Sequence, residues 1–174
     1  MAETDEDETP ALKAMRAHSE DMMGVVPWAS ELGMKITRVE RARAWASLPW
    51  DEKLIGDPDT GVLHGGVITS LLDNLCGVAI AAGLKEFRSM ATLDLRIDYM
   101  RPAEKGRDVI GEAECYQYTR NVAFTRAWAY HETRDRVIAT AAGAFALNDP
   151  ARWASGGASG LAQKVAKAAT EDGA

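Results

Sequence analysis

The clearest pattern in the sequence is a strict alternation of apolar and polar residues between positions 92 and 99. The apolar positions are Leu93, Leu95, Ile97 and Tyr99, with polar or charged residues between them. Because successive side chains of a strand point to opposite faces, this period of two predicts a β-strand with one apolar face. Arg101 and Pro102 end the pattern.

A second pattern, with helical spacing, covers Gly66–Ala82. Its apolar positions are Val67, Ile68, Leu71, Leu72, Leu75, Val78, Ala79 and Ala82. Polar side chains interrupt it at Thr69, Ser70, Asp73 and Asn74. A helix that is apolar on nearly all sides lies inside a protein rather than on its surface. We therefore expect other elements to wrap around it.

Shorter apolar runs supply the remaining strands. Two precede the helix and three follow the alternating strand: Met34–Glu40, Arg43–Pro49, Val109–Tyr118, Val122–His131 and Val137–Leu147. The short polar connections between the last three suit antiparallel hairpins, and Asp51–Gly61 is a loop rich in glycine, proline and aspartate. The predicted order is ββαββββ, in which a four-strand meander after the helix forms a curved antiparallel sheet around it, an α+β architecture.

The two ends of the chain differ from this domain. Residues 1–9 are acidic and predict a disordered tail, and Pro10 opens a helix that we extend to about Met23. Residues 151–174 are rich in alanine, glycine and serine and predict a loosely attached tail, with one short helix from Leu161. A single domain is thus expected over residues 10–150.

Composition and charge restrict the possible functions. The 174 residues, 47% apolar and 26% charged, suffice for one globular domain with a core. The net charge of −6 comes mostly from the acidic tail, and no stripe of Lys and Arg is present, which argues against a nucleic-acid partner. The N-terminus lacks the features of a signal peptide and no apolar run reaches about 18 residues, so we expect a cytoplasmic protein with no membrane partner.

The cysteines do not predict a metal site or a disulfide framework. Cys76 and Cys115 lie far apart in the sequence, each within an apolar segment. We expect both to be buried thiols, and we expect no metal.

The segment Gly61–Gly66 enters the predicted helix and is the first candidate site. Gly65 and Gly66 let a ligand approach the backbone, and the first N–H groups of a helix lack partners and carry the positive end of its dipole. Such groups suit a carbonyl oxygen that acquires negative charge. The structural alternative is a tight turn into the helix, with His64 satisfied by the backbone.

Asp73 is the second candidate, because it is a carboxylate in an apolar helix beside Leu71, Leu72 and Leu75. Burial of an unpaired carboxylate is unfavourable, so the group is hydrogen-bonded, neutral, or exposed to a cleft where it acts. The alternative is a polar stripe, Ser70-Asp73-Asn74-Gly77, that faces solvent or a subunit interface.

Gly66 and Asp73 are separated by about two helical turns, roughly 10 Å, so one helix does not bring both to one carbonyl group. If two such helices lie antiparallel across a dimer axis, Gly66 of one approaches Asp73 of the other. The exposed edge strands of the predicted sheet also favour such pairing.

These residues carry a resemblance to a known family. His64-Gly65-Gly66, Leu71-Leu72-Asp73 and Gly77 resemble the HGG and LxD signature of hotdog-fold acyl-CoA thioesterases of the phenylacetate-pathway (PaaI-like) type. Residues 92–102 and 138–145 resemble the strands that follow it in that family. The resemblance covers about Gly33 to Leu147.

The resemblance implies a hotdog dimer with antiparallel helices, often paired again into a tetramer, that hydrolyses acyl-CoA at its interface. By motif position, Gly66 supplies the oxyanion N–H within the His64 motif, Asp73 is the base or the nucleophile, and Thr92 places water. Members often carry Asn shortly before the motif histidine. This chain has Asp57 and Pro58 there, so that amide contact is absent or replaced.

Several further residues are candidate substrate contacts. Gly65, Asn74 and Asp57 lie near the motif. Turn residues, which are most often solvated, are candidates for the phosphates of coenzyme A: Arg101 with Lys105 and Arg107, and Arg120 with Asn121. Residues with a surface or packing role as the more common explanation are His18, His131, Lys105, Arg107, Trp45, Trp50 and Trp128, of which we expect the tryptophans in the core.

The favoured function is an acyl-CoA thioesterase that needs no cofactor besides the coenzyme A of its substrate. Asp73 acts either through an activated water or through a covalent anhydride, and the sequence does not choose between them. The alternative is a non-catalytic acyl-CoA or lipid-binding module, and a hydratase fits less well. The identity of the acyl group is left open, because the depth of the pocket depends on the packing of both chains.

Overall fold

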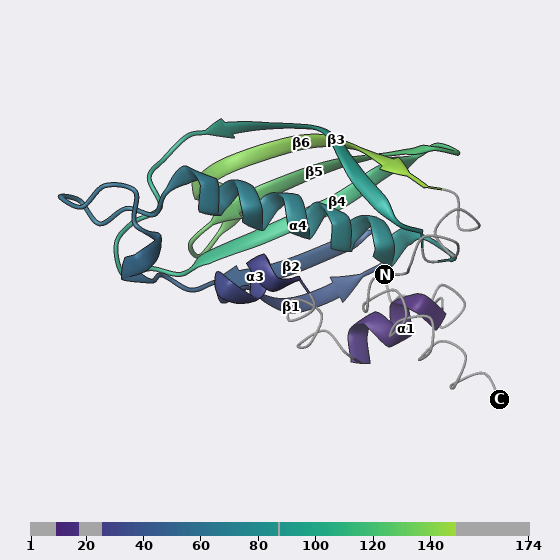
Figure 1. The fold of residues 1–174 in the computed structure, drawn as a ribbon, viewed down its shortest axis with the longest axis horizontal. Coiled ribbons are helices and arrows are strands. Elements are labelled where there is room, and N and C mark those ends of the chain that lie inside the picture. The colour runs from purple at the N-terminus through teal and green to yellow at the C-terminus, as the bar shows by residue number, and fades with distance from the viewer. Residues whose placement is uncertain (1–9, 18–25, 87, 149–174) are drawn as a thin grey trace.

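The central element of the fold is a long helix, α4 (Gly65–Gly83), held in the concave face of an antiparallel sheet (Figure 1). The computed structural model describes residues 10–17, 26–86 and 88–148. Within these residues the helix matches the predicted Gly66–Ala82 to one residue at each end. Its leucines at positions 71, 72 and 75 are fully buried, as the helical spacing of apolar residues requires.

In the described part of the chain the sheet has six strands, all paired antiparallel. In chain order they are β1 (Lys35–Glu40), β2 (Arg43–Leu48), β3 (Met90–Tyr99), β4 (Val109–Tyr118), β5 (Val122–Tyr130) and β6 (Val137–Leu147). The predicted α+β hotdog architecture and the order ββαββββ are confirmed. Short helices join it: α1 (Pro10–Ala17), α3 (Pro27–Glu31), and the 3-10 turns η3 (Glu52–Leu54) and η4 (Arg134–Arg136).

The expected four-strand meander after the helix is wrong in one respect. The order across the sheet is β1-β2-β4-β5-β6-β3, so β3 pairs with β6 and not with β4. In a meander β3 would pair with β4. Strand β2 pairs with that edge of β4 instead, with Trp45 opposite Glu112. The alternation along a strand sets which face of each residue is apolar but not which strand lies beside it, so the sequence pattern did not reveal this crossover.

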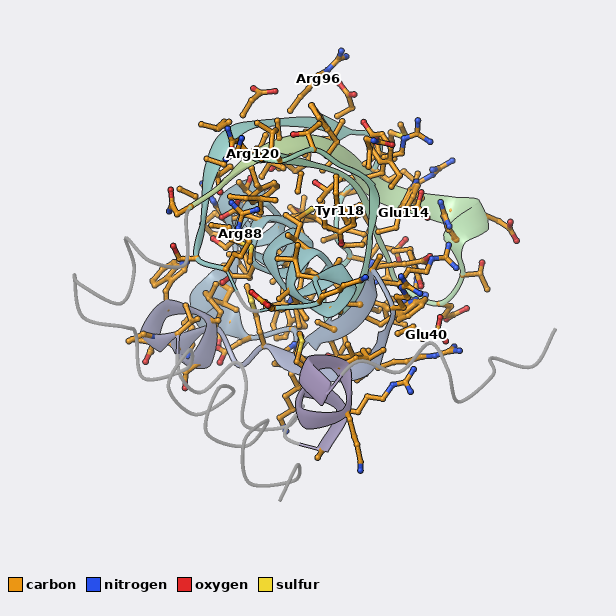
Figure 2. The ribbon with its side chains drawn as sticks, turned by 90° about the vertical axis from the view of Figure 1, so that its right-hand side faces the viewer. Glu40, Arg88, Arg96, Glu114, Tyr118 and Arg120 are labelled. Atoms are coloured by element: carbon orange, nitrogen blue, oxygen red, sulfur yellow. The ribbon has the colours of Figure 1, made fainter. Side chains whose placement is uncertain are left out.

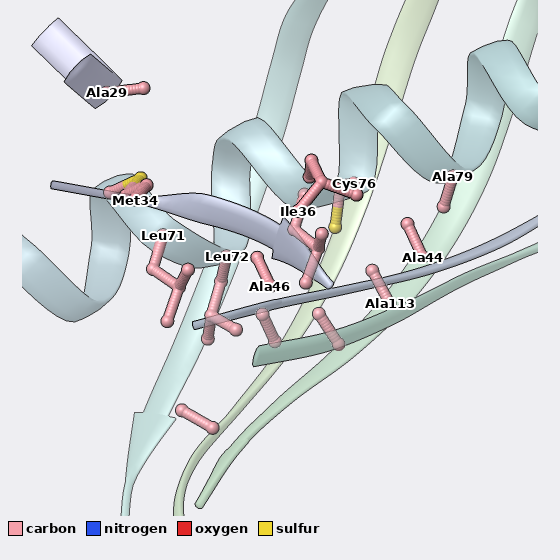
Figure 3. Close-up of a cluster of buried hydrophobic side chains, with 14 of the residues drawn as sticks. Ala29, Met34, Ile36, Ala44, Ala46, Leu71, Leu72, Cys76, Ala79 and Ala113 are labelled. Atoms are coloured by element: carbon pink, nitrogen blue, oxygen red, sulfur yellow. The ribbon is translucent and has the colours of Figure 1, made fainter. Parts of the chain in front are cut away.

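The core lies between α4 and the small side chains of the sheet. Leu71, Leu72, Cys76 and Ala79 of the helix meet the inward-facing residues Ile36, Ala44, Ala46 and Ala113 of the strands (Figure 3). Gly111 on β4 lets the helix come closest: a Cβ at that position would lie 3.0 Å from Leu75 Cδ2 and 3.1 Å from Leu71 Cγ. Small residues at these positions therefore set the distance between helix and sheet.

Strand β3 is at one edge of the sheet and is poorly covered. Its alternation is confirmed, with a bulge between Thr92 and Asp94, but its apolar residues are not buried. Leu93 is 61% exposed and Tyr99 is 51% exposed, while Leu95 and Ile97 are half-buried. The protomer thus leaves an edge strand with open hydrogen-bonding groups and a half-covered apolar face.

The N-terminal helix contributes more to the core than its position suggests. Leu12 and Met15 of α1 are buried. The predicted continuation of this helix to Met23, the acidic tail 1–9 and the C-terminal tail 151–174 with its short helix lie outside the described residues. Helix α3 had no counterpart in the predicted elements.

Among the described residues, α4 has the length and hydropathy that a membrane span requires. It is the helix around which the sheet curls, and its burial explains its apolar character.

Candidate functional site

Two residues predicted for catalysis meet between α4 and β3. The Thr92 hydroxyl donates a hydrogen bond to Asp73 Oδ1, with 2.8 Å between the oxygens. Asp73 is half-buried and its carboxylate is hydrogen-bonded, one of the states expected for a carboxylate in this apolar helix. At 100° per residue, position 73 lies on the side of the helix opposite Leu71 and Leu75.

The polar stripe of α4 exists as the alternative interpretation proposed. Ser70, Asp73, Asn74 and Gly77 are all half-buried and follow one side of the helix. Asn74 donates from Nδ2 to the Ser70 carbonyl (2.8 Å), so its amide is engaged by its own helix. Trp28 of α3 covers one end of the stripe through a hydrogen bond from Nε1 to Ser70 Oγ (3.0 Å). The stripe therefore presents Asp73 as its charged group.

At the start of α4, His64 is the N-cap residue. Its Nδ1 accepts the Gly66 N–H at 2.9 Å, and its carbonyl accepts the Val67 N–H at 3.0 Å. His64 is thus satisfied by the backbone, as the structural alternative held, and the Gly66 N–H is engaged by a side chain. Within the described residues the Gly65 N–H makes no hydrogen bond, so it is the open donor of the first helical turn.

The carbonyl of Gly65 has partners that the sequence patterns did not reveal. The Tyr99 hydroxyl donates to it at 2.7 Å, and Thr69 Oγ1 lies 3.2 Å from it and 2.8 Å from Tyr99 Oη. In the sequence pattern Tyr99 occupies an apolar position of its strand, and Thr69 interrupts the apolar pattern of the helix. The one available signal was a hydroxyl on each of two elements expected to pack together.

One protomer does not unite the whole site. The helix is continuous from residue 65 to 83, so Gly66 and Asp73 stay about two turns, roughly 10 Å, apart. Strand β3 runs between them: Thr92 contacts Asp73, and Tyr99 contacts Gly65. The structure brings Asp73 together with Thr92, and His64 together with Gly66, as two separate groups.

Asp57, at the position where the family often has Asn, stabilises its own loop. It accepts the Asp59 N–H (3.0 Å) and the Thr60 hydroxyl (2.6 Å), and its carbonyl accepts the Gly61 N–H. The Thr60 hydrogen bond lowers the pKa of Asp57 below its ordinary value. The carboxylate therefore holds the turn that leads to His64.

The candidate phosphate contacts lie at opposite ends of the sheet. Arg101 follows the end of β3, near the start of α4, and donates to the Val137 carbonyl at 3.0 Å. Arg120 and Asn121 form the turn between β4 and β5, at the end where α4 finishes; Figure 2 shows Arg120 there beside Arg88, which donates to its carbonyl (2.8 Å). The ends of β3 are about 30 Å apart, so one protomer does not bring Arg101 and Arg120 together.

Of the three tryptophans expected in the core, Trp45 and Trp128 lie on the outer face of the sheet, which corrects that expectation. The guanidinium of Arg134 covers Trp128 at 3.3 Å from the ring centroid, and that of Arg38 covers Trp45 at 4.8 Å. Trp50 does pack against the core, and its Nε1 donates to the Gly61 carbonyl. These residues stabilise the sheet and the loop before α4 rather than lining a pocket beside Asp73.

The remaining candidate residues make structural contacts or are buried. His131 accepts the Glu104 N–H at Nε2 and contacts the Asp108 carbonyl through Nδ1, and it lines a shallow pocket with Arg101, Arg107 and Arg136. Cys76 and Cys115 are buried free thiols, as predicted. In the described part of the chain no three side chains of His, Cys, Asp or Glu gather in a way that would hold a metal ion. His18 lies outside that part.

Comparison with known proteins identifies the family. A family model described as the Thioesterase superfamily matches residues 60–138. The medium/long-chain acyl-CoA thioesterase YigI of Salmonella typhimurium is 30% identical over 110 residues, which make up 56% of this chain and 71% of that protein. The chain belongs to the thioesterase superfamily.

Solved structures also resemble this chain. A crystal structure of a Pseudomonas aeruginosa protein is 39% identical, with a TM-score of 0.68 and coverage of 79% of this chain and 98% of that one. The E. coli PaaI protein from the phenylacetic acid degradation operon has the same TM-score at 16% identity, over 80% of this chain and 94% of that one, a likeness of fold alone. The expected resemblance to PaaI-like hotdog proteins is confirmed.

The region that the family model matches contains most of the candidate site residues. Residues 60–138 include the His64 motif, Asp73, Thr92 and Tyr99, whereas Asp57 precedes them. Thioester hydrolysis is the chemistry of the superfamily, and the hydrogen-bonded Asp73 and Thr92 pair is the candidate site for it in the described structure.

Proposed function

We propose that this thioesterase hydrolyses acyl-CoA at a composite site between two protomers, with Asp73 and Thr92 from one and the Gly65–Gly66 turn from the other. The observation that carries the proposal is the 2.8 Å hydrogen bond between Thr92 and Asp73 on the open side of α4. This bond orients the half-buried Asp73 carboxylate on a side of α4 that the sheet of the same protomer does not cover.

The open edge of β3 supports a dimer. Leu93, Tyr99 and Met100 are each more than half exposed along that edge or just after it. Pairing with a second copy would bury them and satisfy the free backbone groups of the edge strand. Antiparallel α4 helices would then bring the N-terminus of one helix to the middle of the other. We also propose that two such dimers pair into a tetramer.

The proposed chemistry uses each half of the site once. Backbone N–H groups at the positive end of α4 hydrogen-bond the thioester oxygen as it gains negative charge. Asp73 takes a proton from a water molecule whose oxygen attacks the carbonyl carbon; the C–S bond then breaks, and the thiolate of coenzyme A takes up the proton. In the covalent variant the Asp73 oxygen attacks first, the thiolate leaves, and water hydrolyses the resulting anhydride.

His64 has a defined part in this proposal. The Gly65 N–H is open, and the Gly66 N–H is held by His64 Nδ1 until the substrate oxygen replaces that partner. The cap keeps the donor satisfied when no substrate is bound, which avoids the penalty of an unpaired polar group.

The name of a relative and the arginine side chains at the ends of the sheet support a substrate class. YigI is named for medium- and long-chain acyl-CoA, and we propose the same class here. Antiparallel pairing would place Arg101 of one protomer at the same end as Arg120 and Asn121 of the other, where coenzyme A phosphates are proposed to bind. We propose that coenzyme A enters with the substrate, that the enzyme uses no other cofactor and that it acts in the cytoplasm.

The test is a panel of aliphatic and aryl acyl-CoA thioesters, with release of free thiol measured for the wild type and for Asp73→Asn. We expect turnover that is highest on medium or long chains and is lost in Asp73→Asn. Tight binding of the panel without thiol release would instead support the non-catalytic acyl-CoA or lipid-binding module.

A further inference from the structure

We propose that Tyr99, assisted by Thr69, is a positioning residue that fixes the Gly65–Gly66 peptide group as an oxyanion donor, an inference that rests on the proposed function. Neither side chain contacts the reacting atoms in this proposal. Both act through the backbone, because the Gly65 carbonyl and the Gly66 N–H belong to the same planar peptide unit.

The two ends of this peptide unit are held from opposite sides. The Gly65 oxygen accepts the Tyr99 hydroxyl at 2.7 Å, and the Gly66 N–H donates to His64 Nδ1 at 2.9 Å. When a substrate oxygen takes the place of His64 Nδ1, the bond from Tyr99 helps the helix to keep the plane from rotating. A hydrogen bond at the carbonyl also polarises the amide, which strengthens its N–H as a donor.

Thr69 and Tyr99 form a short chain of hydroxyl groups. Their oxygens are 2.8 Å apart, and Thr69 Oγ1 lies 3.2 Å from the Gly65 oxygen. Each hydroxyl has one proton, so the two shorter contacts are filled when Thr69 donates to Tyr99 and Tyr99 donates to Gly65. Thr69 therefore orients the Tyr99 hydroxyl.

The backbone around Tyr99 explains why its ring can take this position. The strand end is fixed because the Met100 and Arg101 N–H groups both donate to the Ile138 carbonyl, at 2.8 and 3.1 Å. On the helix, a Cβ at Gly65 would lie 3.3 Å from the Tyr99 Cζ and Oη atoms, tighter than ordinary contact. Gly65 thus admits the ring, a reason for glycine that is separate from ligand approach.

Within a single protomer, packing alone does not account for Tyr99, because the residue is 51% exposed there, although the proposed dimer would bury it. Its hydroxyl is the group that is engaged. The same strand carries Thr92. Strand β3 therefore orients both groups of the proposed reaction, the Asp73 carboxylate through Thr92 and the Gly65–Gly66 peptide through Tyr99.

The test compares Tyr99→Phe with Tyr116→Phe, a tyrosine of similar exposure (50%) on β4 whose ring packs near Phe124 and Arg126. We expect Tyr99→Phe to lower kcat about tenfold with KM changed less than about twofold, because the oxyanion contact acts in the transition state. Thr69→Val should lower kcat in the same direction, Thr69→Ser should restore it, and Tyr116→Phe should match the wild type. A Tyr99→Phe enzyme with wild-type kcat, or one whose KM alone changes, would overturn the proposal.

A second measurement does not depend on turnover. The amide resonance of Gly66 in an NMR spectrum should shift in Tyr99→Phe and stay in place in Tyr116→Phe, since only the former removes a hydrogen bond from the Gly65 carbonyl. An unchanged Gly66 resonance would overturn the positioning role. If that resonance shifts while the wild type hydrolyses no acyl-CoA, the positioning geometry stands and the proposed function is the part that fails.

Discussion

Thr92 donates its hydroxyl hydrogen to Asp73 across 2.8 Å, from the edge strand of the sheet to the middle of the central helix. The bond uses Oδ1, and among the described residues Oδ2 has no hydrogen-bond partner. One carboxylate oxygen is therefore fixed by the fold while the other remains available to a reactant. A helix and an edge strand have to be placed correctly for this pair to exist.

Asp73→Asn tests the carboxylate. We expect kcat to fall by about two to three decades, the usual scale for loss of a general base or nucleophile. The dimer and acyl-CoA binding should persist, and the melting temperature should stay unchanged or rise, since Asn is isosteric and still accepts the Thr92 hydroxyl. Asp94→Asn, a change of the same type on the outer face of β3, should leave both quantities as in the wild type. A destabilised but active Asp73→Asn protein would contradict the catalytic role.

Thr92→Val removes the hydroxyl at nearly constant volume. Without its donor, the Asp73 carboxylate loses its fixed orientation, so kcat should drop about tenfold, less than on removal of the carboxylate itself. Thr92→Ser retains the donor and should recover most of the loss. Steady-state kinetics on the two variants make the comparison; equal kcat in Thr92→Val and the wild type would show that the hydrogen bond is not used.

Gly111→Ala tests the close approach of helix and sheet. The added Cβ would meet Leu75 Cδ2 at 3.0 Å and Leu71 Cγ at 3.1 Å, so we expect the free energy of unfolding to fall by about 1–3 kcal/mol from overpacking. Gly77→Ala is the matched control, because its Cβ has Met90 Sδ at 3.8 Å as its nearest neighbour and alanine favours a helix. Urea denaturation of both variants gives the comparison, and an unaffected Gly111→Ala protein would mean that the helix is more loosely packed.

The buried Cys76 thiol should lower the free energy of unfolding at high pH. Burial raises the pKa of this thiol from its ordinary value of 9.0 to about 12. Above pH 9 the unfolded chain loses the proton while the folded protein keeps it, so the free energy of unfolding falls as pH rises from about 9 toward 12. Cys76→Ala should show a shallower fall over that range, whatever constant offset its smaller side chain adds. Equal slopes for the two proteins would place the Cys76 thiol in contact with water.

Local patterns predicted the elements well because they depend on periodicity alone. The apolar run of α4 and the alternation of β3 reflect which faces are apolar, and the structure has both segments at the predicted places. The pairing of β3 with β6 was not predictable in this way, because strand neighbours are chosen by tertiary contacts.

The site was predictable to the extent that it depends on residue type and spacing. Asp73 stood out as a carboxylate within an apolar run, but its half-buried state depends on how much of α4 the sheet covers. Gly66 stood out as a helix-entry glycine, yet the occupation of its N–H by His64 is a matter of side-chain rotamer. Tyr99 was hidden because an aromatic residue on a strand face is counted as apolar although its hydroxyl is the group that binds.

The central claim, a site shared between protomers, is tested most directly by mixing two inactive chains. Asp73→Asn removes the carboxylate, and Gly66→Ala places a Cβ 2.9 Å from His64 Nδ1 and obstructs the peptide donor. Each homodimer should be inactive. Equal mixing after dissociation forms heterodimers in which one of the two sites has an intact glycine turn from one chain and an intact carboxylate from the other, so recovery of about a quarter of wild-type turnover is expected. Heterodimers that form, as mass spectrometry of tagged chains would show, and yet remain inactive would contradict the shared site.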